Sequence, residues 1–192
     1  MRRRELLAGA AGLAGAAFFS PAGSWVSTPS DLSSGLNDLL YGHGTGPIPV
    51  GALQAAITAR REEFQTARYD RLSCGLPGLI GAAIATRQYA ASGEEAKACS
   101  LLAEAYIVAA NFMVKLNDDP LALTLADRAP QSAEVGDDPL TIADARRAVA
   151  TVLRRTGRRA KARDLLLSAA ETSNLAAAPR LNSCRCTACC SK

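Results

Sequence analysis

The chain is poor in the residues that most catalytic sites and β-sheet cores use. Aromatic residues make up 5% of its 192 positions while alanine is abundant, which favours closely packed helices over a β-sandwich. His43 is the only histidine, and this removes most histidine-dependent chemistry. No nucleophile–base pair, metal-ligand helix or cofactor fingerprint occurs in the sequence. We therefore predict neither an enzyme nor a bound cofactor.

One glycine-rich stretch, Gly42 to Pro49, invites comparison with a phosphate-binding loop. Such a loop needs a strand before it and a helix N-terminus immediately after it. Here two prolines intervene and no strand is evident. A surface loop is the better interpretation.

The six cysteines are placed too unevenly for a disulfide framework, which spreads its cysteines through the fold. Cys74 and Cys99 stand alone in helical stretches, and we expect both thiols to be buried. The other four fall in the last nine residues: Cys184, Cys186, Cys189 and Cys190. Their thiolates could ligate a soft metal, but this spacing is compressed relative to structural zinc sites. The sequence favours a disordered, oxidation-prone tail and predicts no metal site.

The length suits one domain with a tail at each end. Composition divides the chain into an arginine-led apolar segment (1–24), a linker rich in serine, threonine and proline (25–49), a helical domain (50–174) and the disordered cysteine-rich tail (175–192). Within the linker, Leu36 to Tyr41 is expected to form one short helical turn.

Apolar residues recur at helical spacing through the first part of the helical domain. The expected helices cover Val50 to Tyr69, Tyr69 to Tyr89, and a stretch from a Ser92–Glu95 capping box to about Leu116. Their apolar stripes include Leu53, Ile57, Phe64 and Ala67 in the first, Leu72, Leu76, Leu79, Ile80, Ala83 and Ile84 in the second, and Leu102, Tyr106, Ala109 and Met113 in the third. Pro77 predicts a kink near Ser73. The third helix is apolar on nearly all sides, so it should be central.

Two near-copies follow, NDDPL from Asn117 and GDDPL from Gly136. Each places an aspartate at a helix N-cap and a proline at the first helical position. We interpret them as the starts of repeated helical hairpins, with an irregular period that departs from the roughly 34 residues of a tetratricopeptide repeat.

The stretch from Asp137 to Glu171 predicts two antiparallel helices that meet at Gly157, where the chain must reverse. Ala162, Leu166 and Ala169 share one face of the second helix, and with Gly157 they resemble the second half of a tetratricopeptide repeat. The sequence therefore predicts an all-α fold of stacked antiparallel helical hairpins, a degenerate tetratricopeptide-like array.

The first helix of this last hairpin has two distinct faces. Ile142, Val149, Ala150 and Leu153 should pack in the core. A polar face of Asp144, Arg147, Thr151 and Arg154 would line a concave groove, together with Asn111 of the preceding long helix. These side chains could hold a peptide carboxylate or another anion. The alternative is a solvated helix face.

We expect the groove to take a peptide, small-molecule or protein partner. Six cations crowd the hairpin corner: Arg154, Arg155, Arg158, Arg159, Lys161 and Arg163. No recognition helix, aromatic stacking platform or zinc finger accompanies them, so we expect no direct binding of nucleic acid. The apolar run in residues 8–19 is too short for a stable membrane span. Homodimer formation stays open.

In these residues the chain resembles the C-terminal sensor region of actinobacterial Xre-type helix-turn-helix transcriptional regulators. The resemblance rests on RRELLAGAAGLAG, LLYG at 39–42, YDRL at 69–72 with LPGLI at 76–80, the stretch 101–120 and the stretch 136–170. The resemblance implies a tetratricopeptide-like region that receives a peptide or small-molecule signal. Family members carry a DNA-binding domain ahead of the arginine-rich segment, and this chain begins where that domain should already have ended. We therefore expect a sensor or regulatory module without its own DNA-binding domain, located in the cytoplasm.

The N-terminal segment supports a second interpretation of location. Arg3 and Arg4, followed by an apolar run and then Ala22-Gly23-Ser24, resemble a twin-arginine export signal. On that interpretation the protein is an exported helical binding protein. Export predicts that mature protein accumulates in the culture supernatant with its N-terminus near Trp25. Retention of the full-length chain in the cell would favour the cytoplasmic sensor.

Overall fold

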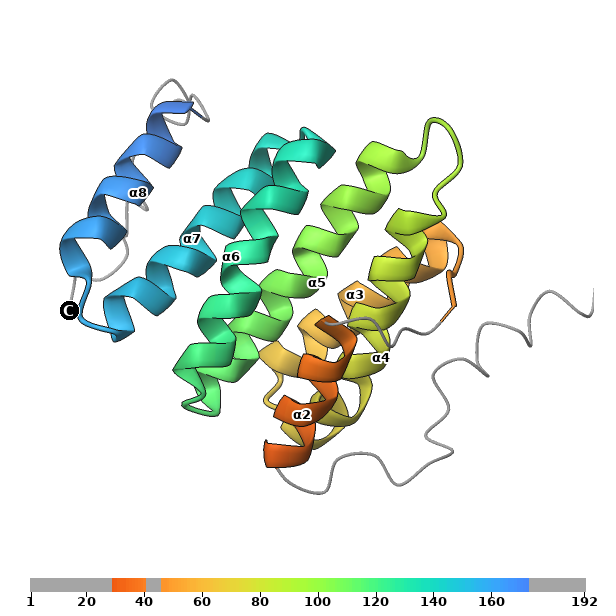
Figure 1. Cartoon of the computed structure of the whole chain (residues 1–192), viewed down its shortest axis with the longest axis horizontal. Coiled ribbons are helices and arrows are strands. Elements are labelled where there is room, and N and C mark those ends of the chain that lie inside the picture. The colour runs from red at the N-terminus through yellow and green to blue at the C-terminus, as the bar shows by residue number, and fades with distance from the viewer. Residues whose placement is uncertain (1–28, 41–45, 173–192) are drawn as a thin grey trace, which may run out of the picture.

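The computed structural model describes residues 29–40 and 46–172, and these form an all-helical array, as the sequence predicted (Figure 1). The helices are α2 (Pro29–Leu40), α3 (Val50–Gln65), α4 (Tyr69–Gln88), α5 (Glu95–Lys115), α6 (Asp119–Gly136), α7 (Pro139–Arg155) and α8 (Arg159–Thr172). Successive helices from α3 onward run antiparallel and form three hairpins, α3–α4, α5–α6 and α7–α8.

The three hairpins turn through the same backbone motif. In each, one residue with positive φ follows the helix C-cap: Ala67 (φ 56°), Asn117 (φ 60°) and Gly157 (φ 81°). The next N–H donates back to a carbonyl five residues earlier, from Arg68 to Glu63, Asp118 to Met113 and Arg158 to Leu153. This is the left-handed helix ending in which otherwise orphaned carbonyls are satisfied. The shared motif identifies the repeated unit of the fold.

Neighbouring hairpins stack through their first helices. α5 contacts both α3 and α7, while α4 packs on α5 and α6 packs on α7. The first helices begin at Val50, Glu95 and Pro139, 45 and 44 residues apart. That spacing is longer than the roughly 34 residues of a tetratricopeptide repeat, because most of the helices are 16–21 residues long.

The two DDPL segments mark successive helices, which corrects our interpretation of them as starts of equivalent units. The first begins α6 inside the middle hairpin, and the second begins α7 between hairpins. Both aspartate caps form: Asp118 accepts from the Leu121 N–H and Asp138 from the Thr141 N–H, each at 3.1 Å. The same local signal therefore starts helices in different places of the repeat.

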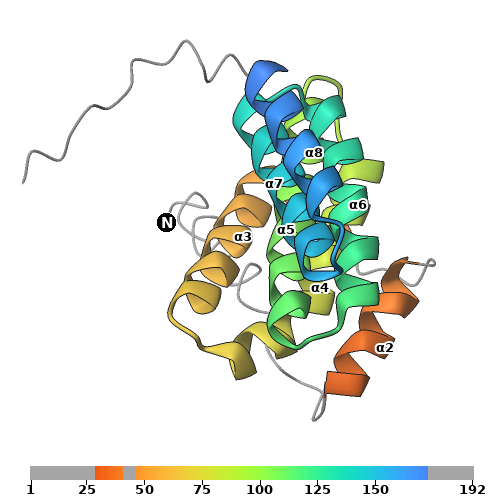
Figure 2. The ribbon, with the colours of Figure 1, turned by 90° about the vertical axis from the view of Figure 1, so that its left-hand side faces the viewer.

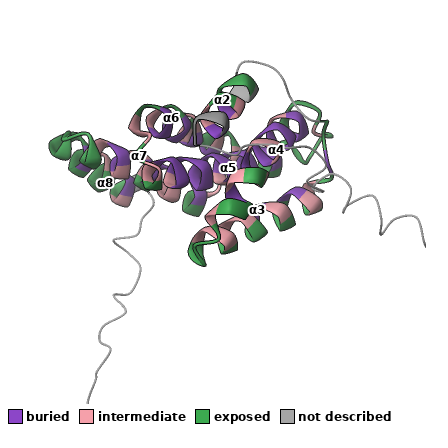
Figure 3. Ribbon diagram, turned by 90° about the horizontal axis from the view of Figure 1, so that it is seen from below, coloured by how far each residue is buried: buried purple, intermediate pink, exposed green. Residues whose placement is uncertain are grey.

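α5 lies at the centre of the array, as the apolar residues on nearly all of its sides predicted. Fourteen of its 21 residues are buried, and Figure 3 shows it lying among α3, α4, α6 and α7. It is the one helix of the described part that is long and apolar enough to cross a membrane, and 78% of that stretch is buried inside the protein. Burial in a protein core accounts for its composition.

The segment expected as a linker contains a docked helix instead. Leu32 and Leu36 of α2 are buried, and a Cβ at Gly35 would lie 3.9 Å from the Pro77 ring of α4. The Ser33 hydroxyl donates to the Asp118 carboxylate at 2.8 Å. The linker prediction was wrong because serine and glycine here permit close packing of a short apolar stripe (Figure 2).

Three further local predictions were wrong. The first helix ends at Gln65, so Ala67 lies in the turn and is exposed. Glu94 is the N-cap of α5 and no side chain caps it, so Ser92 and Glu95 do not form the expected box. Cys74 is exposed, because the buried stripe of α4 passes through Leu72 and Leu76, whereas Cys99 is buried as predicted.

α5 and α6 approach each other closely at the end of the hairpin that lies away from its turn, where Gly136 faces Ala96 and Ser100. A Cβ added to Gly136 would lie 2.2 Å from the Ser100 hydroxyl, 2.8 Å from the Ser100 nitrogen and 3.0 Å from the Ala96 carbonyl. Two of these atoms belong to the α5 backbone and cannot rotate away. Any side chain at position 136 would push the two helices apart.

We therefore expect Gly136→Ala to lower the free energy of unfolding by roughly 1–3 kcal/mol, the cost of overpacking. Gly51→Ala is the matched control, because a Cβ on this helical glycine meets no atom within 4 Å. It should raise stability by roughly 0.5–1 kcal/mol through the better helix propensity of alanine. Urea unfolding measures both, and equal values would contradict the close approach.

Candidate functional site

α7 is anchored by a buried stripe that differs from the predicted one. Thr141, Ala145, Ala148 and Val152 are buried on the side facing the array. Of the four predicted core residues, Ala150 is buried while Ile142, Val149 and Leu153 are only partly buried. Small residues form the stripe because α7 lies close to both α5 and α6. The larger apolar side chains are left at its margins.

α8 contacts the array through very few side chains. Ala162 and Ala169 are each 5% exposed and are its buried residues. Leu166, predicted to pack between them, is 42% exposed, and Leu167 is 56% exposed. Figure 3 shows α8 as a largely exposed outer helix. Leu166 and Leu167 form an apolar surface that the described part of the chain does not cover.

A cleft of about 590 Å³ lies between α7 and α8. We call it the α7–α8 cleft; it is lined by Arg147, Ala150, Thr151, Arg154, Arg159, Ala162, Arg163, Leu166 and Leu167. The leucines and alanines supply an apolar surface, and the four arginines stand around it. The lining contains no acidic residue. Such a surface combines apolar contact with attraction for negative charge.

Neighbouring acids engage two of the four arginines. Arg147 donates to Asp144 at 2.7 Å, and Arg163 lies 3.3 Å from the adjacent Asp164. Both pairs are well exposed, where ion pairs contribute about 0–1 kcal/mol and exchange readily. Arg154 and Arg159 form no ion pair within the described residues. The cleft therefore holds positive charge that the fold itself does not neutralise.

Three of the five predicted groove residues line this cleft: Arg147, Thr151 and Arg154. Asp144 lies beside it as the partner of Arg147. Asn111 is on α5, outside the lining, and Ile107 on the same helix is buried. The cleft thus gathers three of the predicted residues within one hairpin, while Glu104 of α5 pairs with Arg61 of α3 at 3.2 Å.

Arg159, Arg163 and Leu167 were not recognised in the sequence as residues of the same site. The arginines appeared only as part of a charged corner. One member of that corner is engaged elsewhere, because Arg155 pairs with Asp119 and with the Asn117 side chain, both at 2.9 Å. The i, i+4 spacing of Arg159, Arg163 and Leu167 places them on one face of α8, and that signal could have found them.

No metal centre accompanies the cleft. Within residues 29–40 and 46–172, no three His, Cys, Asp or Glu side chains are grouped as metal ligands. The cysteines of the tail lie outside the described residues, as do His43 and the twin-arginine segment. No protein-family model, curated protein or solved structure matches the chain.

Asp138 caps the N-terminus of α7, the helix that forms one side of the cleft. The Thr141 hydroxyl donates to its carboxylate and holds the pKa of Asp138 below its usual value. The backbone N–H groups of Thr141 and Leu140 and the charge of Lys97 act in the same direction, while partial burial opposes them. The ionised carboxylate is therefore the form that stabilises α7.

We expect Asp138→Ala to cost about 1 kcal/mol at neutral pH, as for other N-caps. Because the pKa is lower in the folded chain, this contribution is present above the unfolded value of about 3.9 and is lost as pH falls through the folded pKa. The stability gap between wild type and variant should close in that window. Asp138→Asn is the control, since it keeps an acceptor but removes the titration. A gap that persists at low pH would contradict the assignment.

Proposed function

We propose that the chain is a helical-repeat binding module that captures an acidic segment of a protein partner in the α7–α8 cleft. The observation that carries this proposal is the pairing of two exposed leucines, Leu166 and Leu167, with four arginines and no acid in one lining. A peptide with carboxylates beside apolar side chains would neutralise the arginines and cover the leucines. The resemblance to sensor regions that receive a peptide signal agrees with this function.

The geometry favours a peptide over nucleic acid. The cleft offers leucines and alanines between its cations, whereas single-stranded nucleic acid is held by aromatic side chains on which bases stack. The lining contains no aromatic residue. Guanidinium groups bind carboxylates through paired hydrogen bonds, which adds direction to the charge attraction.

The partner segment is expected to lie along the cleft as a helix. α7 and α8 are 17 and 14 residues long. No described residue covers Leu166 and Leu167 on the side of α8 that lines the cleft. An amphipathic helix placed there would extend the stack by one element, as each hairpin already buries its face against the next. We propose a regulatory role for such docking, in which the module reports the presence of its partner.

A designed peptide tests the charge and apolar requirements together. The probe is a fluorescein-labelled 16-residue helix with leucine on one face and glutamate on the other, and its lysine counterpart is the comparison. We expect the glutamate peptide to bind and the lysine peptide not to. Equal binding of the two peptides would contradict the proposal.

Arg147→Gln with Arg154→Gln should raise the Kd of the glutamate peptide roughly two- to thirtyfold, since each exposed arginine–carboxylate pair contributes about 0.2–1 kcal/mol. Arg68→Gln with Arg71→Gln is the control: it removes the same charge from exposed positions at the α3–α4 turn, away from the cleft. Fluorescence anisotropy measures both. Equal losses in the two double variants would show that net charge alone attracts the peptide.

A further inference from the structure

A second cleft lies on another face of the array, in the groove between α4 and α6. α2 covers the lower half of this groove, where Leu32 and Leu36 are buried and Ser33 reaches Asp118 at the start of α6. No described residue covers the upper half, which forms a cleft of about 650 Å³ with α5 at its floor. We call it the α4–α6 cleft. Its volume is in the range of small-molecule sites.

The open half differs in chemistry from the half that α2 covers. Its floor is Cys99, Leu102 and Tyr106 of α5, and its rim is mostly polar: Arg87 of α4 and Thr124, Asp127, Arg128, Gln131 and Ser132 of α6, with Leu123 and Val135 beside them. An apolar helix such as α2 would bury the charged groups of this rim away from water, which is costly. The lining suits a small solute with one charged end.

Tyr106 supplies the second observation. The residue is only 5% exposed and lines the cleft, yet its hydroxyl forms no hydrogen bond with the described residues. It is not among the atoms sealed from solvent, so the phenol opens into the cleft. A buried tyrosine usually finds a partner for its O–H. No described residue supplies this partner, so the hydroxyl is available to a molecule bound in the cleft.

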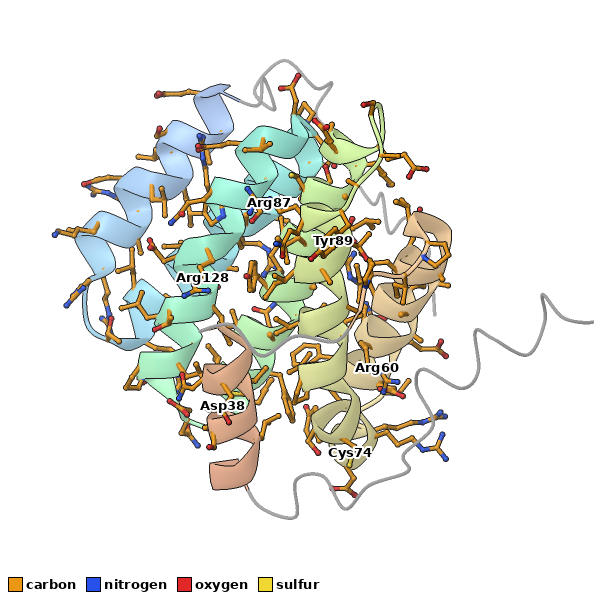
Figure 4. The ribbon with its side chains drawn as sticks, turned by 45° about the vertical axis from the view of Figure 1, so that its right-hand side comes forward. Asp38, Arg60, Cys74, Arg87, Tyr89 and Arg128 are labelled. Atoms are coloured by element: carbon orange, nitrogen blue, oxygen red, sulfur yellow. The ribbon has the colours of Figure 1, made fainter. Side chains whose placement is uncertain are left out.

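The free groups in the cleft are mainly donors. Thr124 and Ser132 already donate to backbone carbonyls, and Gln131 donates to Asp127. Arg87 has no ion-pair or hydrogen-bond partner within the described residues, and Figure 4 shows it on the same face as Arg128. Two guanidinium groups against one carboxylate leave the rim positive. Arg87 and the Tyr106 hydroxyl are donors without a partner among the described residues, and an acceptor that carries negative charge would suit both.

We propose that the α4–α6 cleft binds a small organic anion with an apolar body. The anionic group accepts from the Arg87 guanidinium and the Tyr106 hydroxyl, and the apolar body covers Cys99 and Leu102. This site is separate from the α7–α8 cleft and takes a ligand of different size. Next to Arg87 in sequence, Thr86 ties α4 to the segment before α3: its hydroxyl accepts from the Ile48 N–H and donates to the Ile48 carbonyl, both at 3.1 Å.

Octanoate is the probe, titrated into the full chain and followed by calorimetry and by amide chemical shifts. We expect saturable binding with shifts at Cys99, Leu102 and Tyr106. Octan-1-ol, which lacks the charge, and inorganic phosphate, which lacks the apolar body, should each bind at least tenfold more weakly. Equal binding of octan-1-ol, or shifts confined to α7 and α8, would overturn the proposal.

Arg87→Gln should raise the octanoate Kd about tenfold, the effect of losing a charge-assisted hydrogen bond. Tyr106→Phe, which removes only the hydroxyl, should raise it about threefold. Arg71→Gln, on the exposed first turn of the same helix, and the Arg147→Gln, Arg154→Gln double variant should leave it unchanged. An unchanged Kd in Arg87→Gln and Tyr106→Phe would overturn the site, because neither replacement removes packing volume from the core.

Discussion

The close packing of α5 against α6 is the constraint on which the rest of the array depends. Alanines form much of the buried surface of both helices, including Ala122, Ala126, Ala129 and Ala133 on α6. Small side chains let the two backbones approach, and at Gly136 the approach leaves no room for a Cβ. α5 is thereby buried over most of its surface, and α3, α4 and α7 pack against it.

The outer hairpin is built on the same turn but is packed less tightly. α7 rests on its neighbours through small residues, with Asp138 holding its first turn. α8 in turn buries only two alanines and leaves two leucines in contact with solvent. No described residue beyond α8 covers this end of the stack. This end of the array therefore carries two exposed leucines, Leu166 and Leu167, beside two arginines, Arg154 and Arg159, that form no ion pair with the described residues.

The two clefts follow from different features of one architecture. The α7–α8 cleft lies at the end of the stack and combines leucines with arginines, which suits an acidic segment of a protein. The α4–α6 cleft lies between second helices, beside α2, and is lined by a largely buried tyrosine whose hydroxyl has no partner among the described residues. An enclosed floor with one polar atom suits a small molecule. Binding at the two sites is expected to be independent, because they share no lining residue.

The sequence by itself determined the helices, the centre of the fold and part of the α7–α8 cleft. Helical periodicity marked α5 as the central helix, the two aspartate–proline pairs placed the starts of α6 and α7, and Gly157 placed the last turn, because these signals act over a few residues. The spacing of Arg147, Thr151 and Arg154 put them on one face for the same reason.

Only the tertiary structure decided which surfaces meet. It docked α2 in a segment that reads as a linker, and it placed Arg147, Thr151 and Arg154 in the lining of a cleft within one hairpin, with Asn111 outside that lining. It also placed Arg87 and Tyr106 in the lining of one cleft, because contacts between distant helices depend on how closely the backbones approach, and no local pattern records that distance.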